Sequence, residues 1–268
     1  MINKRIYFFW GNPVMSWMRY MTLYSFRRMN PDWDMTIYLS EHKQNGKTWR
    51  MRNLQDFFFY DGANYINRIN DLGLRIKTIN KYQDMTPSHA SNFFKWDLLA
   101  NGGGIYADMD ILWVKPIDDF YNRIKGYDVA ICQTNFLSIG LLGSSGNKFF
   151  KDIYENTFKN YDKERYQSAG VENIYDLYNC DKENVLDEAR KKYPYLWYFN
   201  IPMETVYPFN SKQVDEVFSR PVPMPEKSIG YHWYAGHPTT QKFNNLMNEK
   251  NYKKYNTLFS KLCSDILS

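Results

Sequence analysis

Asp108 and Asp110 have the residue type and the spacing that could carry chemistry in this sequence. They lie two positions apart, directly after the apolar run Ile105 to Ala107, which follows three consecutive glycines. In an extended segment two such carboxylates point to opposite faces, but a turn at the end of a strand can direct both toward one cation. Carboxylate oxygens suit Mg²⁺ or Mn²⁺, ions that keep coordination positions for substrate phosphates. The pair therefore predicts a metal site that neutralises a diphosphate leaving group.

The segments around this pair indicate an α/β sheet. Short apolar runs predict strands, and helical segments alternate with them. The expected strands are 6–10, 35–39, 74–79, 105–107, 111–114, 128–132 and 136–142. We expect one helix to begin at Pro13, capped by Asn12, and to run to about Met29, and another to begin at Thr86-Pro87 and end in the glycines at 102–104. Open α/β sheets bind ligands at the carboxyl ends of their strands, where the two aspartates lie.

The second half of the chain has a weaker pattern. Residues 148–192 are mostly polar with helical spacing, and residues 194–225 are rich in proline, which predicts loops and short strands. From Thr239 to the end the pattern predicts one terminal helix. No internal repeat or low-complexity linker divides the chain, so we expect a single domain.

The stretch from Ser91 to Pro116, SNFFKWDLLANGGGIYADMDILWVKP, resembles the DXD region of glycosyltransferase family 32. The family pattern is roughly S-D-x-x-R on a helix, then G-G-x-Y-x-D-x-D, a strand and K-P. KRIYFFWGNP and NPDWDMTIYL are similar to its first two strands, so the resemblance covers roughly residues 4–143. It implies a retaining enzyme that uses a nucleotide-activated sugar. It also implies a GT-A fold, a Rossmann-like mixed sheet flanked by helices, in a single domain, 1–268. We expect a nucleotide-sugar-binding half, 1–116, and an acceptor-binding half with a C-terminal helix, 117–268.

Roles carry over from the family only at matching positions. By this resemblance Asp110 ligates the metal, and Asp108 contacts the donor sugar or ribose and supports the metal. Tyr106 lies in the same block and is assigned to the donor site. Asn92 and Lys95 stand where the family has Asp and Arg, one helical turn apart. An amide therefore replaces a carboxylate, and the point charge of an ammonium group replaces a guanidinium that can make two parallel hydrogen bonds. This departure predicts either a different donor sugar or only a solvated polar face at these two positions.

The segment GYHWYAGHP, residues 230–238, resembles the family's H-x-x-x-x-S-W block. The resemblance places His232 at the histidine and His237 at the serine, so we expect His232, and secondarily His237, as a further metal ligand. Neutral imidazole favours Mn²⁺ over Mg²⁺, and ordinary packing of an aromatic loop is the alternative. Trp10 ends the first strand, where the family places the nucleobase, and it either stacks on that base or packs in the core. His89 either reaches the site or caps or packs its helix.

Composition limits the class of protein. Hydrophobic residues make up 44% of the chain and charged residues 24%, which indicates a folded core and excludes global disorder. Three cysteines without CxxC spacing exclude a disulfide framework and a thiolate zinc site, and they fit a reducing compartment. The apolar run near the start is too short for a signal peptide, and no run suits a membrane span. We expect a soluble, cytoplasmic protein.

Net charge and aromatic content leave the acceptor open. The charge of +5 and the aromatic share of 18% fit anionic and stacking ligands, but this charge is too small to establish a nucleic-acid partner. The acceptor is then a glycan or lipid-linked saccharide, as in polysaccharide biosynthesis, or a hydroxylated base in DNA, as in phage-type DNA modification. A non-catalytic protein that binds sugar nucleotides or glycans is the alternative of another class. Asn92 and Lys95 favour that alternative, and the intact aspartates oppose it.

Overall fold

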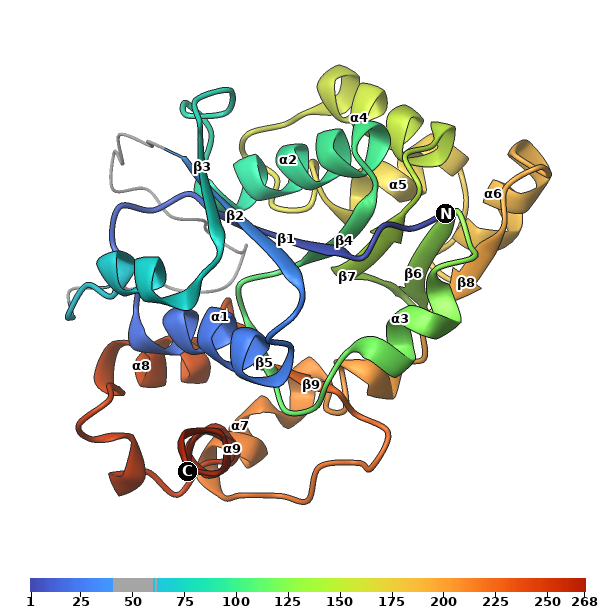
Figure 1. The fold of residues 1–268 in the computed structure, drawn as a ribbon. Coiled ribbons are helices and arrows are strands. Elements are labelled where there is room, and N and C mark those ends of the chain that lie inside the picture. Colours follow the sequence, from blue (N-terminus) through green and yellow to red (C-terminus); the bar gives the residue numbers. More distant parts are fainter. Residues whose placement is uncertain (41–59, 61) are drawn as a thin grey trace.

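A mixed sheet forms the centre of the structure, a computed structural model that describes residues 1–40, 60 and 62–268 (Figure 1). In spatial order the seven strands of the main sheet are β3 (Arg75–Ile79), β2 (Asp34–Ser40), β1 (Arg5–Trp10), β4 (Gly104–Ala107), β7 (Leu137–Ser144), β6 (Val129–Gln133) and β8 (Tyr198–Asn200). Neighbouring strands from β3 to β4 are parallel, β7 is antiparallel to β4 and to β6, and β6 is parallel to β8. A smaller antiparallel sheet pairs β5 (Ile111–Trp113) with β9 (Gly230–His232).

Helices cover both faces of the main sheet (Figure 1). One face carries α2 (Pro87–Asn101), α4 (Lys148–Asn160) and α5 (Val171–Tyr178), with α6 (Val185–Lys192) next to α5. The other face carries α1 (Trp17–Met29) and α3 (Asp118–Ile124). The small sheet packs with α7 (Val214–Ser219) and α9 (Leu258–Leu267), and α8 (Pro238–Leu246) contacts α7. Short 3-10 helices occupy Ile66–Leu72, Met203–Thr205, Ser211–Gln213 and Tyr252–Lys254. Across the described part of the chain, no helix combines the length and apolar character that a membrane crossing needs.

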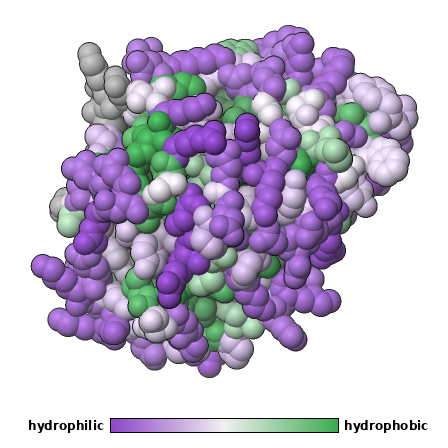
Figure 2. Space-filling view, in the orientation of Figure 1, coloured by the Kyte–Doolittle hydropathy of each residue, from purple (hydrophilic) through white to green (hydrophobic). Residues whose placement is uncertain are grey.

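The central strand β1 explains why its sequence is a continuous apolar run. Successive side chains point to opposite faces, so Phe8 packs edge-on against Phe26 of α1, whereas Phe9 stacks on Phe94 of α2. A parallel strand covered by helices on both faces needs apolar residues at every position. Outside this core, hydrophilic residues cover most of the face drawn in Figure 2, and apolar residues appear there only in small groups.

The strands predicted in the first half are confirmed, each within two residues at either end. The second predicted helix is also confirmed: α2 begins at Pro87 after Thr86 and ends at Asn101. Gly103 and Gly104 follow with φ of 67° and 112°, conformations that favour glycine. They let the chain pass directly from α2 into β4, and therefore set the distance between that helix and the aspartates.

The predicted start of the first helix is wrong. The helix begins at Trp17 with Ser16 as its N-cap, and Asn12 instead accepts a hydrogen bond from the N–H of Val14. The reason is a contact that is distant in sequence. Asn64 accepts a hydrogen bond from the N–H of Met15 and donates one to the preceding loop, which keeps residues 12–15 out of helical geometry.

The prediction of one terminal helix is also wrong. Two helices, α8 and α9, occupy this region, and the chain between them is irregular. Asn251 donates to the carbonyl of Leu246 and accepts from the N–H of Asn248, so a side chain satisfies the backbone groups at the end of α8. A helix, α7, also forms within the proline-rich region that the sequence assigned to loops and short strands.

Replacing Gly104 by alanine tests the junction between α2 and β4. The new Cβ would lie 2.8 Å from Cε2 of Tyr7 on a residue with φ of 112°. We expect Gly104→Ala to lower the free energy of unfolding by about 2–4 kcal/mol, because strain and a clash add. Gly126→Ala is the control, since no atom lies within 4 Å of its Cβ, and its effect should be below about 1 kcal/mol. Urea denaturation measures the free energy of unfolding of both variants. Equal losses would contradict the claim that the junction between α2 and β4 requires glycine at position 104.

Candidate active site

The turn that carries Asp108 and Asp110 lies between β4 and β5. β4 is buried along its whole length and runs parallel to β1, so both strands end at the same edge of the sheet. The N–H of Asp108 donates to the carbonyl oxygen of Gly140 at 2.7 Å, which fixes the first aspartate against β7. The two aspartates therefore lie at the carboxyl edge of the parallel strands, where ligands bind in open α/β sheets.

His232 reaches the same place through the small sheet. The register of β5 and β9 sets Ile111 opposite His232, and the N–H of Trp233 donates to the carbonyl oxygen of Asp110 at 2.9 Å. Nε2 of His232 then lies 3.2 Å from Oδ1 of Asp110. The N–H of Ala235 donates to Oδ2 of the same carboxylate at 2.9 Å. The end of β9 and the loop after it thus wrap around Asp110.

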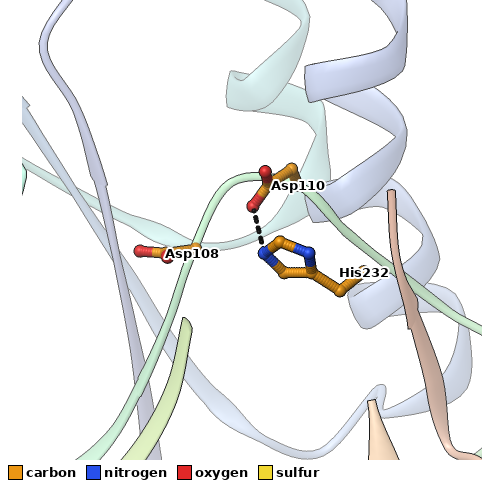
Figure 3. A group of neighbouring side chains, drawn as sticks. All are labelled: Asp108, Asp110 and His232. Atoms are coloured by element: carbon orange, nitrogen blue, oxygen red, sulfur yellow. Dashed lines mark ion pairs between the residues drawn. The ribbon is translucent and has the colours of Figure 1, made fainter. Parts of the chain in front are cut away.

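Asp108, Asp110 and His232 form a group that fits a divalent cation. Each offers one ligand atom, and these atoms lie within 4.8 Å of one another; Figure 3 shows Asp110 and His232 facing each other, with Asp108 beside them on the same loop. Burial would raise the pKa of Asp110, but the facing imidazole lowers it below the usual range, so the carboxylate is ionised. Nδ1 of His232 is buried and has no partner among the described residues. Two carboxylates and an imidazole are a donor set that suits Mn²⁺.

Lys95 and Asn92 take different positions although they share one helix. Nζ of Lys95 donates to Oδ1 of Asp108 at 3.0 Å and to the carbonyl oxygen of Ile139 at 3.2 Å, and its side chain is only 2% exposed. Asn92 is nearly buried and faces Gly170, where an added Cβ would lie 3.2 Å from its Nδ2. Lys95 therefore contacts Asp108 directly, and Asn92 lies beside the loop that follows α4.

Tyr106 is buried beneath this ion pair. Its ring centroid lies 4.8 Å from Nζ of Lys95, and its hydroxyl shares a hydrogen bond with the hydroxyl of Ser91 at 2.8 Å. Burial raises its pKa well above the ordinary value, and the charge of Asp108 adds to this effect, so the hydroxyl keeps its proton. The ring of Tyr106 thus packs against the ammonium group of Lys95, a contact that the sequence pattern did not predict.

Trp10 and Trp233 both contact the guanidinium of Arg19, a residue that the sequence analysis did not identify. Arg19, in the first turn of α1, places its guanidinium carbon 5.3 Å from the ring centroid of Trp10 and 4.9 Å from that of Trp233. Burial lowers the pKa of this guanidinium, while the charges of Asp110 and Asp108 oppose that change. No signal in the sequence identified Arg19, because the predicted helix start at Pro13 placed it in the second turn, whereas the helix begins at Trp17 and has Arg19 in its first turn.

Tyr166, from the loop between α4 and α5, borders the same group. Burial raises its pKa to about 12, and the charges of Asp110 and Asp108 contribute. Across the site, a Cβ at Gly236 would lie 3.9 Å from the hydroxyl of Tyr166. The loop after α4 therefore approaches the loop after β9, and no sequence pattern indicated this approach.

Tyr207 and Tyr234 pack against the imidazole of His232. Their ring centroids lie 5.1 and 4.5 Å from that of the histidine. The hydroxyl of Tyr207 accepts hydrogen bonds from the N–H groups of Gly140, at 2.9 Å, and Leu141, at 3.1 Å. Tyr234 has a φ of 49°, a conformation uncommon outside glycine that concentrates at functional sites. Together the two rings hold the imidazole in place.

The other histidines lie apart from this group. His237 is the N-cap residue of α8, and it is not a member of the cluster formed by the described acidic and histidine side chains. His89 is fully buried and hydrogen-bonds the hydroxyl of Tyr161 at 2.9 Å and the carbonyl oxygen of Arg165 at 3.2 Å. The packing role that the sequence left open for His89 is the one that the structure has.

Comparison with known proteins identifies the class. A family model described as "Glycosyltransferase sugar-binding region containing DXD motif" matches residues 14–129, a range that includes Asp108 and Asp110. The match indicates a glycosyltransferase enzyme over this part of the chain. This confirms the resemblance seen in the sequence and favours an enzyme over the alternative of a non-catalytic binding protein. No curated protein sequence matches the chain.

Several solved glycosyltransferase structures are similar to this chain, and GlyE is the one of the three below whose TM-score exceeds 0.5. The glycosyltransferase GlyE of Streptococcus pneumoniae TIGR4 has a TM-score of 0.51 at 11% identity, covering 98% of this chain and 63% of GlyE. PaToxG glycosyltransferase has a TM-score of 0.47 at 13% identity, covering 97% of this chain and 86% of PaToxG. The galactosyltransferase LgtC, solved with donor and acceptor sugar analogs, has a TM-score of 0.44 at 11% identity, covering 93% and 99%. The predicted single-domain GT-A fold is confirmed.

Gly140 lies directly against the residues of the candidate site. A Cβ there would lie 2.8 Å from the hydroxyl of Tyr207 and 3.1 Å from Oδ2 of Asp108. We expect Gly140→Ala to weaken Mn²⁺ binding by about 10–100-fold, because the methyl group displaces residues that orient the ligands. Gly143→Ala, on the same strand, is the control: its Cβ meets Ile2 and Ala130 and not the site. Calorimetric titration with Mn²⁺ compares the two variants, and unchanged affinity in Gly140→Ala would contradict this placement.

Proposed function

We propose that the protein is a metal-dependent, retaining glycosyltransferase that moves a sugar from a UDP- or GDP-sugar to a hydroxyl of a glycan. The observation that carries this proposal is the convergence of Asp108, Asp110 and His232 within 4.8 Å at the carboxyl edge of the sheet. The match to a DXD sugar-binding region, which covers both aspartates, supports the same role.

The expected cofactor is Mn²⁺, with Mg²⁺ as the alternative. Asp110 and His232 would hold the ion, with Asp108 as a further ligand, because imidazole nitrogen suits Mn²⁺ better than Mg²⁺. The secondary expectation for His237 is not part of this proposal, since that residue is outside the group. When bound, the ion supplies positive charge that stabilises the diphosphate as it leaves.

The residues around the metal group have distinct tasks in this proposal. Oδ1 of Asp108 is paired with Lys95, so Oδ2 is the oxygen left for a hydroxyl of the donor sugar or ribose. Trp10 would stack on the nucleobase and Asn92 would border the donor, while Tyr106, which is fully buried, would act on the donor only through Lys95. These roles follow from position and from the resemblance to the family.

The contacts of the two aspartates support retention without a covalent intermediate. Asp108 is paired with Lys95, and Asp110 is contacted by His232 and by the N–H of Ala235. In this proposal both carboxylates serve the donor and the ion, and neither is assigned the role of covalent nucleophile. The acceptor hydroxyl would then attack the anomeric carbon on the face that the diphosphate leaves. The new bond joins the acceptor oxygen to that carbon, the bond to the phosphate oxygen breaks, and the acceptor proton passes to the leaving phosphate.

A glycan is the acceptor that we favour over DNA. Tyrosine rings and hydroxyls surround the aspartates, and such side chains offer both apolar faces and hydrogen bonds to sugars. A glycan acceptor would place the enzyme in polysaccharide biosynthesis, and a hydroxylated base would place it in DNA modification. Cys132, Cys180 and Cys263 are all free thiols, which supports the cytoplasmic location expected from the sequence.

Removal of one carboxylate charge tests the metal-dependent reaction. Asp110→Asn keeps the size of the side chain and an oxygen for the N–H of Ala235 but removes the charge. We expect release of nucleoside diphosphate, measured over a panel of nucleotide sugars with Mn²⁺, to fall by about 10²–10⁴-fold. Excess EDTA should abolish the activity of the unmodified enzyme. Asp119→Asn, at an exposed position outside the site, should retain full activity, and activity of Asp110→Asn in EDTA would refute the proposal.

Binding to duplex DNA tests the choice of acceptor. A DNA-modifying enzyme would contact several phosphates, and its affinity would fall steeply between 50 and 200 mM salt, by about 10³-fold or more. We expect no measurable affinity for duplex DNA even at 50 mM salt. Tight binding that falls with salt would favour the DNA acceptor over the glycan.

A further inference from the structure

Arg19 occupies a position that its own helix disfavours. It is the third residue of α1, whose first turn contains no acidic residue, whereas Arg27 and Arg28 occupy the last turn. The N-terminal end of a helix carries partial positive charge, so a cation there is unfavourable and a cation at the C-terminal end is favourable. Arg27 and Arg28 follow this rule and Arg19 does not, which indicates that something other than helix stability keeps it there.

Two indole rings hold the Arg19 guanidinium in one place. Its central carbon lies 5.3 Å from the ring centroid of Trp10 and 4.9 Å from that of Trp233, which come from opposite ends of the chain. Stacking of this kind stabilises a guanidinium without using its N–H groups. The flanking indoles supply no acceptor either, because indole nitrogen only donates. In both rings Nε1 is buried without a partner among the described residues.

The guanidinium N–H groups of Arg19 have no protein acceptor in the described part of the chain. Within residues 1–40, 60 and 62–268 the guanidinium makes no hydrogen bond and no ion pair. Asp110 and Asp108 act on it by charge alone. Lys95 is different, because its ammonium group is already paired with Asp108 and Ile139. A partly buried cation whose N–H groups have no acceptors costs folding free energy, unless an anion binds and accepts hydrogen bonds from it.

We propose that the guanidinium of Arg19 binds the diphosphate of the donor nucleotide. This inference rests on the proposed function, because it assumes that a nucleoside diphosphate binds beside Asp108 and Asp110. The planar guanidinium matches phosphate oxygens in a bidentate contact, and the indoles hold it beside the group that would carry the metal. Since Arg19 covers one face of Trp10, a stacked nucleobase would use the other face.

Calorimetric titration of Arg19→Met tests this assignment. The probes are UDP and GDP, compared with uridine and guanosine, which lack the phosphates, and each is measured with Mn²⁺ and in EDTA. We expect Arg19→Met to lose about 10–100-fold in affinity for the nucleoside diphosphate that the unmodified enzyme binds, in both conditions, and to keep its affinity for the nucleoside. Arg19→Lys should lose less affinity for the diphosphate, because lysine retains the positive charge but cannot make the bidentate contact of a guanidinium.

Arg28→Met is the matched control. It makes the same substitution on the same helix at an exposed position in the last turn, so it should bind the diphosphate like the unmodified enzyme. Equal affinity of the Arg19 variants and the unmodified enzyme would overturn the inference, as would equal losses for the nucleoside and the diphosphate, which would indicate a packing role.

Thermal denaturation separates failure of folding from failure of binding. Removing a cation from the start of α1 should leave the melting temperature of Arg19→Met unchanged or raised. Where that variant fails to fold, competition decides the question: inorganic pyrophosphate should displace the diphosphate from the unmodified enzyme in EDTA, and Arg19→Lys should bind pyrophosphate more weakly. No displacement would overturn the inference.

Failure of the unmodified enzyme to bind either diphosphate would overturn the proposed function as well, whereas normal transfer with unimpaired Arg19 variants would overturn this inference alone.

Discussion

The pairing of β5 with β9 is the constraint on which the site depends. This short ladder joins parts of the chain that are 125 residues apart at the contact between Asp110 and Ala235. Its register is fixed because Tyr231 and Trp233 are buried, at 1% and 0% exposure, in the core beside α9, which turns His232 between them to the opposite face. A slip of one residue would exchange the two faces. It would present an indole or phenol to the aspartates in place of an imidazole.

Charge balance around the aspartates is the second organising feature. Two carboxylates so close together repel each other, and the fold offsets that repulsion with basic side chains of different kinds. Lys95 makes a direct, buried ion pair with Asp108, and His232 faces Asp110. Arg19 contributes from the other side of the site through its charge. The arrangement offsets part of this repulsion and still leaves carboxylate oxygen atoms available.

The sequence predicted those parts of the fold that local patterns determine. Strands β1 and β4 were predictable because burial on both faces requires apolar residues throughout, and the end of α2 because a left-handed conformation selects Gly103. The start of α1 was not predictable, because Asn64 decides it from a distance along the chain. The aspartates and His232 were identified from motifs, and the structure brings these three together. Arg19 and Tyr166 were missed, because only tertiary packing brings them to the site.

The two indoles beside Arg19 make the intrinsic tryptophan fluorescence of the protein sensitive to the charge at this position. Indole emission depends on the electric field across the ring, and here a single charged group lies against both Trp10 and Trp233. A ligand that neutralises this charge changes the field on two of the eight tryptophans of the chain. Intrinsic fluorescence can therefore follow occupancy of the site in real time, without a label on the enzyme or on its substrates.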